Sequence, residues 1–260
     1  MGNKKLSIVK IGGNVIENET ALLSFLDNFA QIEGAKILIH GGGKEATKLS
    51  QKLGIATQMV EGRRITDKDT VDIITMVYGG LINKRIVSQL QARNCNALGF
   101  SGADGNTILS EKRPVADIDY GFVGDVKQVN GPFIDVLLQN GITPVFCAIT
   151  HDKKGQLLNT NADTVASEVA IAMSQFYETS LYYCFEKQGV LRSIEDENSV
   201  ITDINSATYE TLLNEKIIAD GMIPKMKNCF HALQHQVHKV CIGNPQMIQK
   251  NNTLFTTLTL

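Results

Sequence analysis

Two short runs of β-forming residues near the start of the chain end in glycines that could bind a phosphate group. The first run, 6–13, ends in Gly12-Gly13, and the second, 37–43, ends in three glycines. Glycine permits backbone conformations in which amide N–H groups approach an anion closely, and Lys10 places a cation beside the first turn. Two ordinary strand-to-helix turns would contain the same residues. The pattern therefore indicates an anion site without identifying the anion.

The second glycine run also has to be compared with the known nucleotide-binding motifs. It is not a P-loop, because glutamate follows Lys44 where that motif requires Ser or Thr. Residues 41–46 do match the spacing of a dinucleotide-binding fingerprint, and Glu61 stands at a suitable distance to bind a ribose hydroxyl. A dehydrogenase is therefore an alternative, although it leaves Lys10 and its glycines unexplained.

Three charged residues lie where helices are expected to begin. Asp163 falls in the first turn of a helix expected over about 162–174, capped by Asn159 or Asn161, and the helix dipole alone would explain a carboxylate there. Lys225 follows a proline at another expected helix start, where a cation opposes the dipole, so an anion is expected nearby. Arg64 suits a bidentate contact with a carboxylate, or a solvated surface position.

The composition favours small-molecule partners. The chain has 260 residues and a net charge of -2 without a long basic run, so neither nucleic acid nor an anionic membrane is an expected partner. The five cysteines are dispersed and lack C-x-x-C spacing, which disfavours disulfides and zinc. No apolar stretch approaches the ~20 residues that span a bilayer, and no signal peptide is recognisable, so we expect a cytoplasmic protein.

The order of the expected elements is that of an α/β protein. Strands are expected over 36–40, 143–149, 180–185 and 237–242, alternating with amphipathic helices that include a long one over about 67–86. Parallel strands joined by helices follow from this alternation. Residues 101–129 are rich in Gly and Asp and predict hairpins.

Seven segments, in order and along nearly the whole chain, resemble the amino acid kinase family. They are 10–13 (KIGG), 40–43 (HGGG), 62–66 (GRRIT), 99–105 (GFSGADG), 121–124 (GFVG), 159–163 (NTNAD) and 221–225 (GMIPK). The resemblance implies a three-layer α/β/α sandwich with a mainly parallel central sheet. It further implies an N-terminal lobe, residues 1–175, for an acylated amino acid and for dimerisation, and a C-terminal lobe, residues 176–260, for ATP.

The resemblance also implies a reaction, the transfer of the ATP γ-phosphoryl group to the side-chain carboxylate of an N-acylglutamate in arginine biosynthesis. A carboxylate with a pKa of about 4.3 is ionised at neutral pH, so no general base is required. The difficulty is instead the repulsion between two anions, which cations and N–H donors relieve. Mg²⁺ is expected to arrive with ATP, held mainly by phosphate oxygens and water rather than by protein ligands.

By position in the family's segments, Lys10 and Lys225 are implied as the transition-state cations and Asp163 as the group that orients both. The residues implied to bind the acylated amino acid are Gly42, Gly43, Arg64, Asn159 and Asn161. Those implied to bind ATP are Lys10, Gly12, Gly13, Glu186 and Lys225. Glu186 stands where the family usually has a Ser/Thr-Asp-Val stretch. Only its position beside the glycines suggests a functional role for His40, and a structural role is the preferred interpretation.

Several alternatives remain open at this stage. The acyl group could be acetyl or succinyl, and an acylated aminoadipate or free glutamate could be the acceptor. A catalytically silent binding protein of the same fold is a non-enzymatic alternative, which the presence of both lysines disfavours. Only nine residues precede Lys10, whereas arginine-inhibited hexameric relatives have an additional N-terminal helix, so a homodimer is expected.

Overall fold

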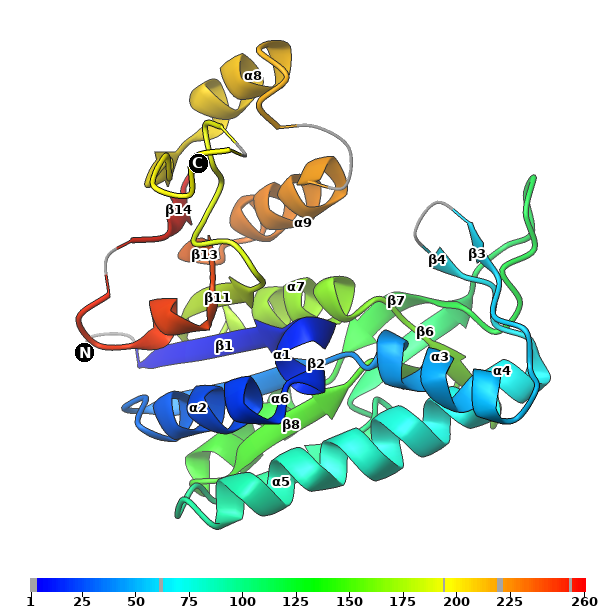
Figure 1. Cartoon of the computed structure of the whole chain (residues 1–260). Helices are drawn as coiled ribbons and strands as arrows, with labels where there is room; N and C mark the ends of the chain where they lie inside the picture. Colours follow the sequence, from blue (N-terminus) through cyan, green and yellow to red (C-terminus); the bar gives the residue numbers. More distant parts are fainter. Residues whose placement is uncertain (1–3, 61–62, 194, 219–221, 253) are drawn as a thin grey trace.

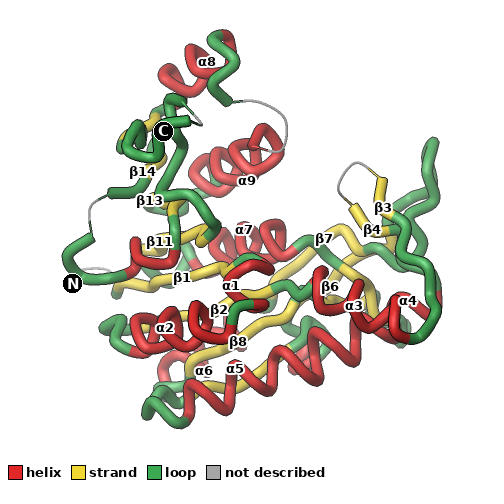
Figure 2. Tube along the Cα trace, viewed as in Figure 1, coloured by secondary structure: helices red, strands yellow, loops and turns green. Residues whose placement is uncertain are grey.

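A central sheet lies between two layers of helices (Figures 1 and 2). The computed structural model describes residues 4–60, 63–193, 195–218, 222–252 and 254–260. Within these residues the sheet has eight strands. In spatial order they are β12 (Asp203–Ile204), β14 (Thr256–Leu258), β13 (Lys239–Gly243), β11 (Glu178–Cys184), β1 (Lys5–Ile11), β2 (Ala35–His40), β8 (Thr143–Cys147) and β5 (Ala97–Phe100).

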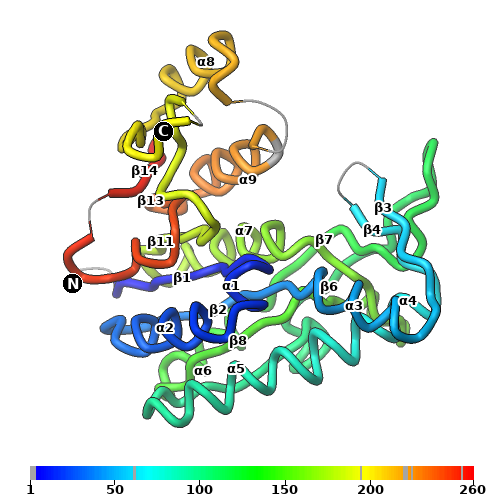
Figure 3. Tube along the Cα trace, in the orientation of Figure 1, coloured from blue at the N-terminus to red at the C-terminus, as the bar shows by residue number. Residues whose placement is uncertain are grey.

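The sheet is mainly parallel, as predicted. β1 pairs in parallel with both β11 and β2, and β13 and β8 continue the parallel order on either side. Only the pairing of β13 with β14 is antiparallel among the neighbours of this sheet in the described residues. Figure 3 shows the first strand, in blue, between β2, which follows it in the chain, and β11, which comes from a distant part of the chain. Strands from both expected lobes therefore form one continuous sheet.

The two faces of the sheet bury separate apolar cores. Leu6 and Ile8 of β1 face a core formed with α6 (Gly131–Gln139), α7 (Ala162–Met173) and α9 (Met222–Gln234). Val9 and Ile11 face the opposite core. Because side chains alternate along a strand, Lys10 is on the same face as Leu6 and Ile8 and therefore faces the α7 layer. The α-helices that contribute to this second core are α1 (Gly13–Glu17), α2 (Glu19–Ala30), α3 (Gly43–Lys52), α4 (Lys68–Ile74) and α5 (Asn83–Gln91).

The long helix predicted after Thr66 is present but is not uniformly α-helical. It runs through α4, a π-helical segment η1 (Thr75–Ile82) and α5. Asp67 caps its start by accepting a hydrogen bond from the Thr70 amide at 2.8 Å. Apolar spacing did not predict this π-helical segment, whose buried residues are Val77, Tyr78 and Ile82.

A smaller sheet covers one end of the main sheet. Its strands lie in the order β10 (Leu157–Asn159), β9 (Ile149–His151), β6 (Ile108–Lys112) and β7 (Gly124–Val129), which includes the hairpin expected in residues 101–129. The single strand predicted over 143–149 is wrong at its end. The chain leaves β8 at Cys147 and enters β9, because Ile149 pairs with Asn159 of the second sheet.

Two smaller departures complete the comparison. The helix expected after Pro224 begins at Met222, so Lys225 is its fourth residue. The short strands β3 (Met59–Val60) and β4 (Arg63–Arg64), together with β12 and β14, were not predicted, because two or three residues carry no periodicity. The last helical elements are α8 (Ser206–Asn214), capped by Asn205, and the 3₁₀ segments η2 (Asp104–Asn106) and η3 (Pro245–Ile248).

Candidate functional site

Two lysines from opposite ends of the sequence meet one carboxylate at the carboxyl end of β1. Lys10 Nζ lies 2.6 Å from Asp163 Oδ1, and Lys225 Nζ lies 3.8 Å from Asp163 Oδ2. The three side chains come from β1, from the first turn of α7 and from the first part of α9. The strand alternation that turns Lys10 toward α7 explains why it reaches Asp163. The structure thus brings together the three residues implied as catalytic.

The Asp163 carboxylate is largely enclosed, with 15% of its side chain exposed. Burial by itself raises the pKa of this carboxyl, but the charges of Lys10 and Lys225 outweigh that effect and hold its pKa below the usual value. The carboxylate is therefore ionised at neutral pH. It fixes the directions of two ammonium groups while leaving each lysine with further N–H donors for an anion.

The N-terminal end of α7 is ordered by its own side chains. Asn161 caps the helix by accepting hydrogen bonds from the amides of Asp163 and Thr164, at 2.7 and 3.2 Å. Of the two predicted caps, Asn161 is therefore correct for this role. Asn159, on β10, instead donates to the Thr66 hydroxyl at 3.0 Å. The cap holds Asp163 at the helix start, where Lys10 and Lys225 converge.

The first glycine turn lies directly beside this charged group. Gly12 follows β1 and is the N-cap residue of α1, and Gly13 is the first residue of that helix. A side chain at Gly12 would contact the Cys184 carbonyl oxygen of the neighbouring strand β11 at 3.5 Å. Lys10 and the two glycine amides are thus separated by only a short piece of backbone. This is the arrangement that an anion would need.

The second glycine turn is packed against both α7 and the long helix. The Cβ position at Gly41 lies 3.7 Å from Ala162 Cβ, which places this turn next to the start of α7. At Gly42 an added Cβ would lie 2.5 Å from Ile82 Cδ1 and 2.7 Å from Tyr78 Cδ1. Real Cβ contacts are not that short, so the backbone approaches the long helix more closely than any side chain at Gly42 would allow.

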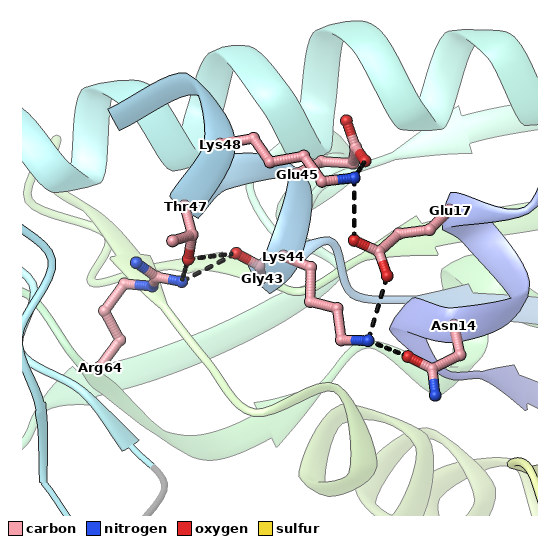
Figure 4. Close-up of polar contacts among 8 residues, drawn as sticks. All are labelled: Asn14, Glu17, Gly43, Lys44, Glu45, Thr47, Lys48 and Arg64. Atoms are coloured by element: carbon pink, nitrogen blue, oxygen red, sulfur yellow. Dashed lines mark hydrogen bonds and ion pairs between the residues drawn. The ribbon is translucent and has the colours of Figure 1, made fainter. Parts of the chain in front are cut away.

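Arg64 is a buried residue that contacts the second glycine turn. Its Nη2 donates to the Gly43 carbonyl and to the Thr47 hydroxyl, both at 2.8 Å, as Figure 4 shows. Its Nη1 donates to the Thr57 hydroxyl at 3.2 Å. A guanidinium held in this way has a fixed orientation. The structure therefore places Arg64 with Gly43, as the resemblance implies, rather than in the solvated position that was the alternative.

His40 is fully buried under the same turn. Its Nδ1 lies 2.8 Å from the Gly41 carbonyl oxygen, and its Nε2 lies 3.1 Å from Asn83 Nδ2. Asn83 also donates to the Val145 carbonyl at 2.9 Å. Burial lowers the pKa of His40 to about 4, so the ring is neutral at pH 7. The residue connects the turn to the long helix, which is a structural arrangement.

Phe185 and Glu186 follow β11 in the part of the chain that is expected to bind ATP. Lys225 Nζ lies 5.8 Å from the centre of the Phe185 ring, which follows β11. The next residue, Glu186, is exposed. Its proposed contact with ATP stays a prediction. Glu61, Gly62 and Gly221, which belong to segments used in the sequence analysis, lie outside the described residues.

An ion-pair cluster that the sequence analysis missed connects the two glycine turns. Glu17, on α1, contacts Lys44 at 3.1 Å and Lys48 at 3.0 Å, both on α3, and Lys44 also donates to Asn14 (Figure 4). The two lysines lower the pKa of Glu17, chiefly through their hydrogen bonds. The spacing of Lys44 and Lys48, four residues apart, could have indicated a shared helix face but not its partner.

The described residues contain no group of three or more His, Cys, Asp or Glu side chains that could hold a metal ion. Across the same part of the chain, no helix combines the length and the apolar character needed to cross a membrane. Lys10, Lys225 and the glycine amides can bind anionic groups, and the Asp163 carboxylate fixes the positions of the two lysines.

Comparison with known proteins gives consistent similarities over nearly the full length. Residues 5–244 match the model of the Amino acid kinase family. The chain is 54% identical to the acetylglutamate kinase of Cytophaga hutchinsonii over 260 residues, 98% of each protein. It is 50% identical to the acetylglutamate kinase of Bacteroides thetaiotaomicron over 95% of this chain and 96% of that one. The crystal structure of smu.665 from Streptococcus mutans superposes with a TM-score of 0.80 at 25% identity, covering 98% of both chains.

Proposed function

Since the chain belongs to the amino acid kinase family, we propose that it transfers the γ-phosphoryl group of ATP to the side-chain carboxylate of N-acetyl-L-glutamate, in arginine biosynthesis. The observation that carries the proposal is the convergence of Lys10 and Lys225 on Asp163 beside the first glycine turn. The similarity to acetylglutamate kinases supports the acceptor. Because the chain belongs to this family, the match of residues 41–46 to a dinucleotide-binding fingerprint no longer supports a dehydrogenase.

The two lysines act on the phosphoryl group during transfer. Charge spreads over its equatorial oxygens in the transition state, and preorganised cations stabilise that charge more than they stabilise the ground state. Lys10 and Lys225 supply these cations, and Asp163 holds them in place. The acceptor carboxylate is already ionised at neutral pH, so the site works without a general base.

ATP and the acceptor occupy different parts of the chain. ATP binds to the C-terminal lobe, residues 176–260, and Glu186 lies toward the nucleotide. The phosphates of ATP also contact the end of β1 and the first glycine turn, so they lie at Lys10, Gly12, Gly13 and Lys225. Mg²⁺ accompanies ATP and is held mainly by phosphate oxygens and water. The acylated amino acid binds within residues 1–175. Arg64 binds its α-carboxylate with Asn159 as a second donor, and Asn161 and the amides of Gly42 and Gly43 complete the acceptor site.

The active assembly is a cytoplasmic homodimer. Support comes from apolar side chains exposed on the long helix and on an edge strand: Met76 at 54% and Leu81 at 48% on η1, and Leu98 at 46% on β5. A second copy would cover such a surface and the open strand edge. Light scattering of the purified protein should give twice the chain mass. A monomer or a hexamer would contradict this part of the proposal.

A hydroxamate assay tests the reaction and its acceptor. Hydroxylamine traps an acyl phosphate, so the protein is supplied with ATP, Mg²⁺ and one of four acceptors: N-acetylglutamate, N-succinylglutamate, glutamate or N-acetylaminoadipate. N-Acetylglutamate should give the highest kcat/KM. A clear preference for the succinyl compound or for aminoadipate would change the acceptor but not the reaction.

Two variants of the same strand make the assay specific to the site. Lys10→Met should lower the rate of hydroxamate formation by about 10²- to 10³-fold, whereas Lys5→Met, which changes an exposed lysine at the start of β1, should leave it unchanged. If no acceptor yields hydroxamate while calorimetry detects binding of N-acetylglutamate, the protein is a catalytically silent binding protein and the kinase proposal is wrong.

A further inference from the structure

The π-helical middle of the long helix places an aromatic ring against the second glycine turn. Tyr78 is the fourth residue of η1, and 5% of its surface is exposed. Its Cδ1 and Cε1 atoms lie 2.7 and 2.9 Å from the Cβ position at Gly42, so the ring contacts the glycine backbone directly. π-helical turns are rare and often occur at functional sites, where the extra residue redirects a side chain.

The hydroxyl of this ring extends past Gly42 to the next residue. Tyr78 Oη lies 3.7 Å from the Cβ position at Gly43, and Arg64 Nη2 lies 3.8 Å from the same point. Both polar groups are therefore on one side of the turn. Arg64 is held there by three hydrogen bonds, whereas no hydrogen bond within the described part of the chain involves the Tyr78 hydroxyl.

The chemistry of this hydroxyl suits a donor. Burial raises the pKa of Tyr78 above its ordinary value, and the Arg64 guanidinium acts weakly in the opposite direction. The group therefore keeps its proton at neutral pH and can donate to an anion. Packing on Gly42 requires only the ring, which phenylalanine would supply equally well. The hydroxyl is not needed for this packing, so its proton can be donated to a ligand oxygen on the same side of the turn as Arg64.

We propose that Tyr78 is a substrate-binding residue whose hydroxyl donates a hydrogen bond to the α-carboxylate of the acylated amino acid, the group that Arg64 binds. This inference rests on the proposed function, because it takes that acceptor as the ligand. A carboxylate oxygen has several acceptor sites, so one carboxylate can accept hydrogen bonds both from the Arg64 N–H groups that make no contact within the described residues and from the Tyr78 hydroxyl. The π-helical segment then serves to present the tyrosine to the substrate.

The first test is Tyr78→Phe in the hydroxamate assay with N-acetylglutamate. Loss of a hydrogen bond to a charged group should raise KM about tenfold or more, and kcat should stay within about twofold because the contact is the same in the ground and transition states. The matched control is Tyr209→Phe, whose ring packs on Phe230 in the C-terminal part of the chain. The control should leave both constants unchanged.

The second test asks which substrate oxygen the hydroxyl contacts. N-Acetyl-4-aminobutyrate keeps the acetamido group and the reacting carboxylate but lacks the α-carboxylate. Its inhibition constant should be the same in the wild type and in Tyr78→Phe. An unchanged KM in Tyr78→Phe, or an inhibition constant that rises with it, would overturn the inference. A wild type that forms no hydroxamate would instead refute the proposed function.

Discussion

Acidification should destabilise the protein through His40, a residue that holds the second glycine turn. In the folded protein the ring is neutral, with Nδ1–H donating to the Gly41 carbonyl and Nε2 accepting from the Asn83 amide. A proton on Nε2 would face the Asn83 N–H group instead of a lone pair. Because the ring is fully buried, water cannot replace the lost interaction.

The size of the effect follows from the two protonation equilibria. Burial lowers the pKa of His40 to about 4, with the Gly41 carbonyl acting in the opposite direction and Lys84 adding to the decrease, against an ordinary value of 6.5. The unfolded chain therefore takes up the proton first as the pH falls. The contribution of His40 to the unfolding free energy is constant above about pH 6.5. It declines by about 1.4 kcal/mol per pH unit down to about pH 4, a total of about 3 kcal/mol.

The assay is urea unfolding of the wild type and of His40→Gln between about pH 7.5 and about pH 4.5. Glutamine can keep both hydrogen bonds but does not titrate. The wild type should lose about 2 to 3 kcal/mol of unfolding free energy relative to the variant over this range. His238→Gln, at a histidine whose side chain is 57% exposed, should show no such difference. A pH-independent gap between the wild type and His40→Gln would refute the reasoning.

Three further predictions concern the site itself. Lys10→Ala and Lys225→Ala should each lower kcat by about 10²- to 10³-fold with little change in KM, because the lysines bind charge that develops in the transition state; a large rise in KM at constant kcat in the hydroxamate assay would mean that their roles are binding ones. Arg64→Ala should raise the KM for N-acetylglutamate by about tenfold or more and leave the KM for ATP unchanged, since it lies with Gly43; equal changes in both constants would contradict its assignment to the acceptor. Gly42→Ala should cost about 1 to 3 kcal/mol in thermal or urea unfolding, because its methyl group would lie 2.5 Å from Ile82 Cδ1; Ile82→Val, which removes that atom, should restore part of the loss, and a Gly42→Ala variant as stable as the wild type would show that the close approach is not limiting.

Local patterns predicted most of the fold. Short stretches of sequence indicated the long helix and the buried strands β2, β11 and β13. These features depend on residues that are close together in the sequence, so a short stretch is enough to predict each of them. The end of β8 was not predictable in this way, because the change to β9 depends on a partner strand that follows later in the chain.

For the candidate site, too, the sequence indicated the residues but not how they contact one another. The residue types and the glycine turns indicated an anion site, and the family resemblance named Lys10, Asp163 and Lys225 as its charged members. The contact of Lys10 and Lys225 with one carboxylate, at 2.6 and 3.8 Å, depends on the parallel sheet, which places the end of β1 against the helix layer that contains α7 and α9. Their assigned roles stay predictions until the variants are measured.

What the sequence determined by itself was the set of elements and the residues at their ends, because helix caps, glycine turns and strand periodicity act over a few residues. Only the tertiary structure decided that Glu17 joins α1 to α3, that Arg64 lies on Gly43 and that the π-helical turn presents Tyr78 beside it. Each of these contacts joins residues whose separation along the chain carries no periodic signal. Side-chain packing between distant elements, rather than local propensity, sets their geometry.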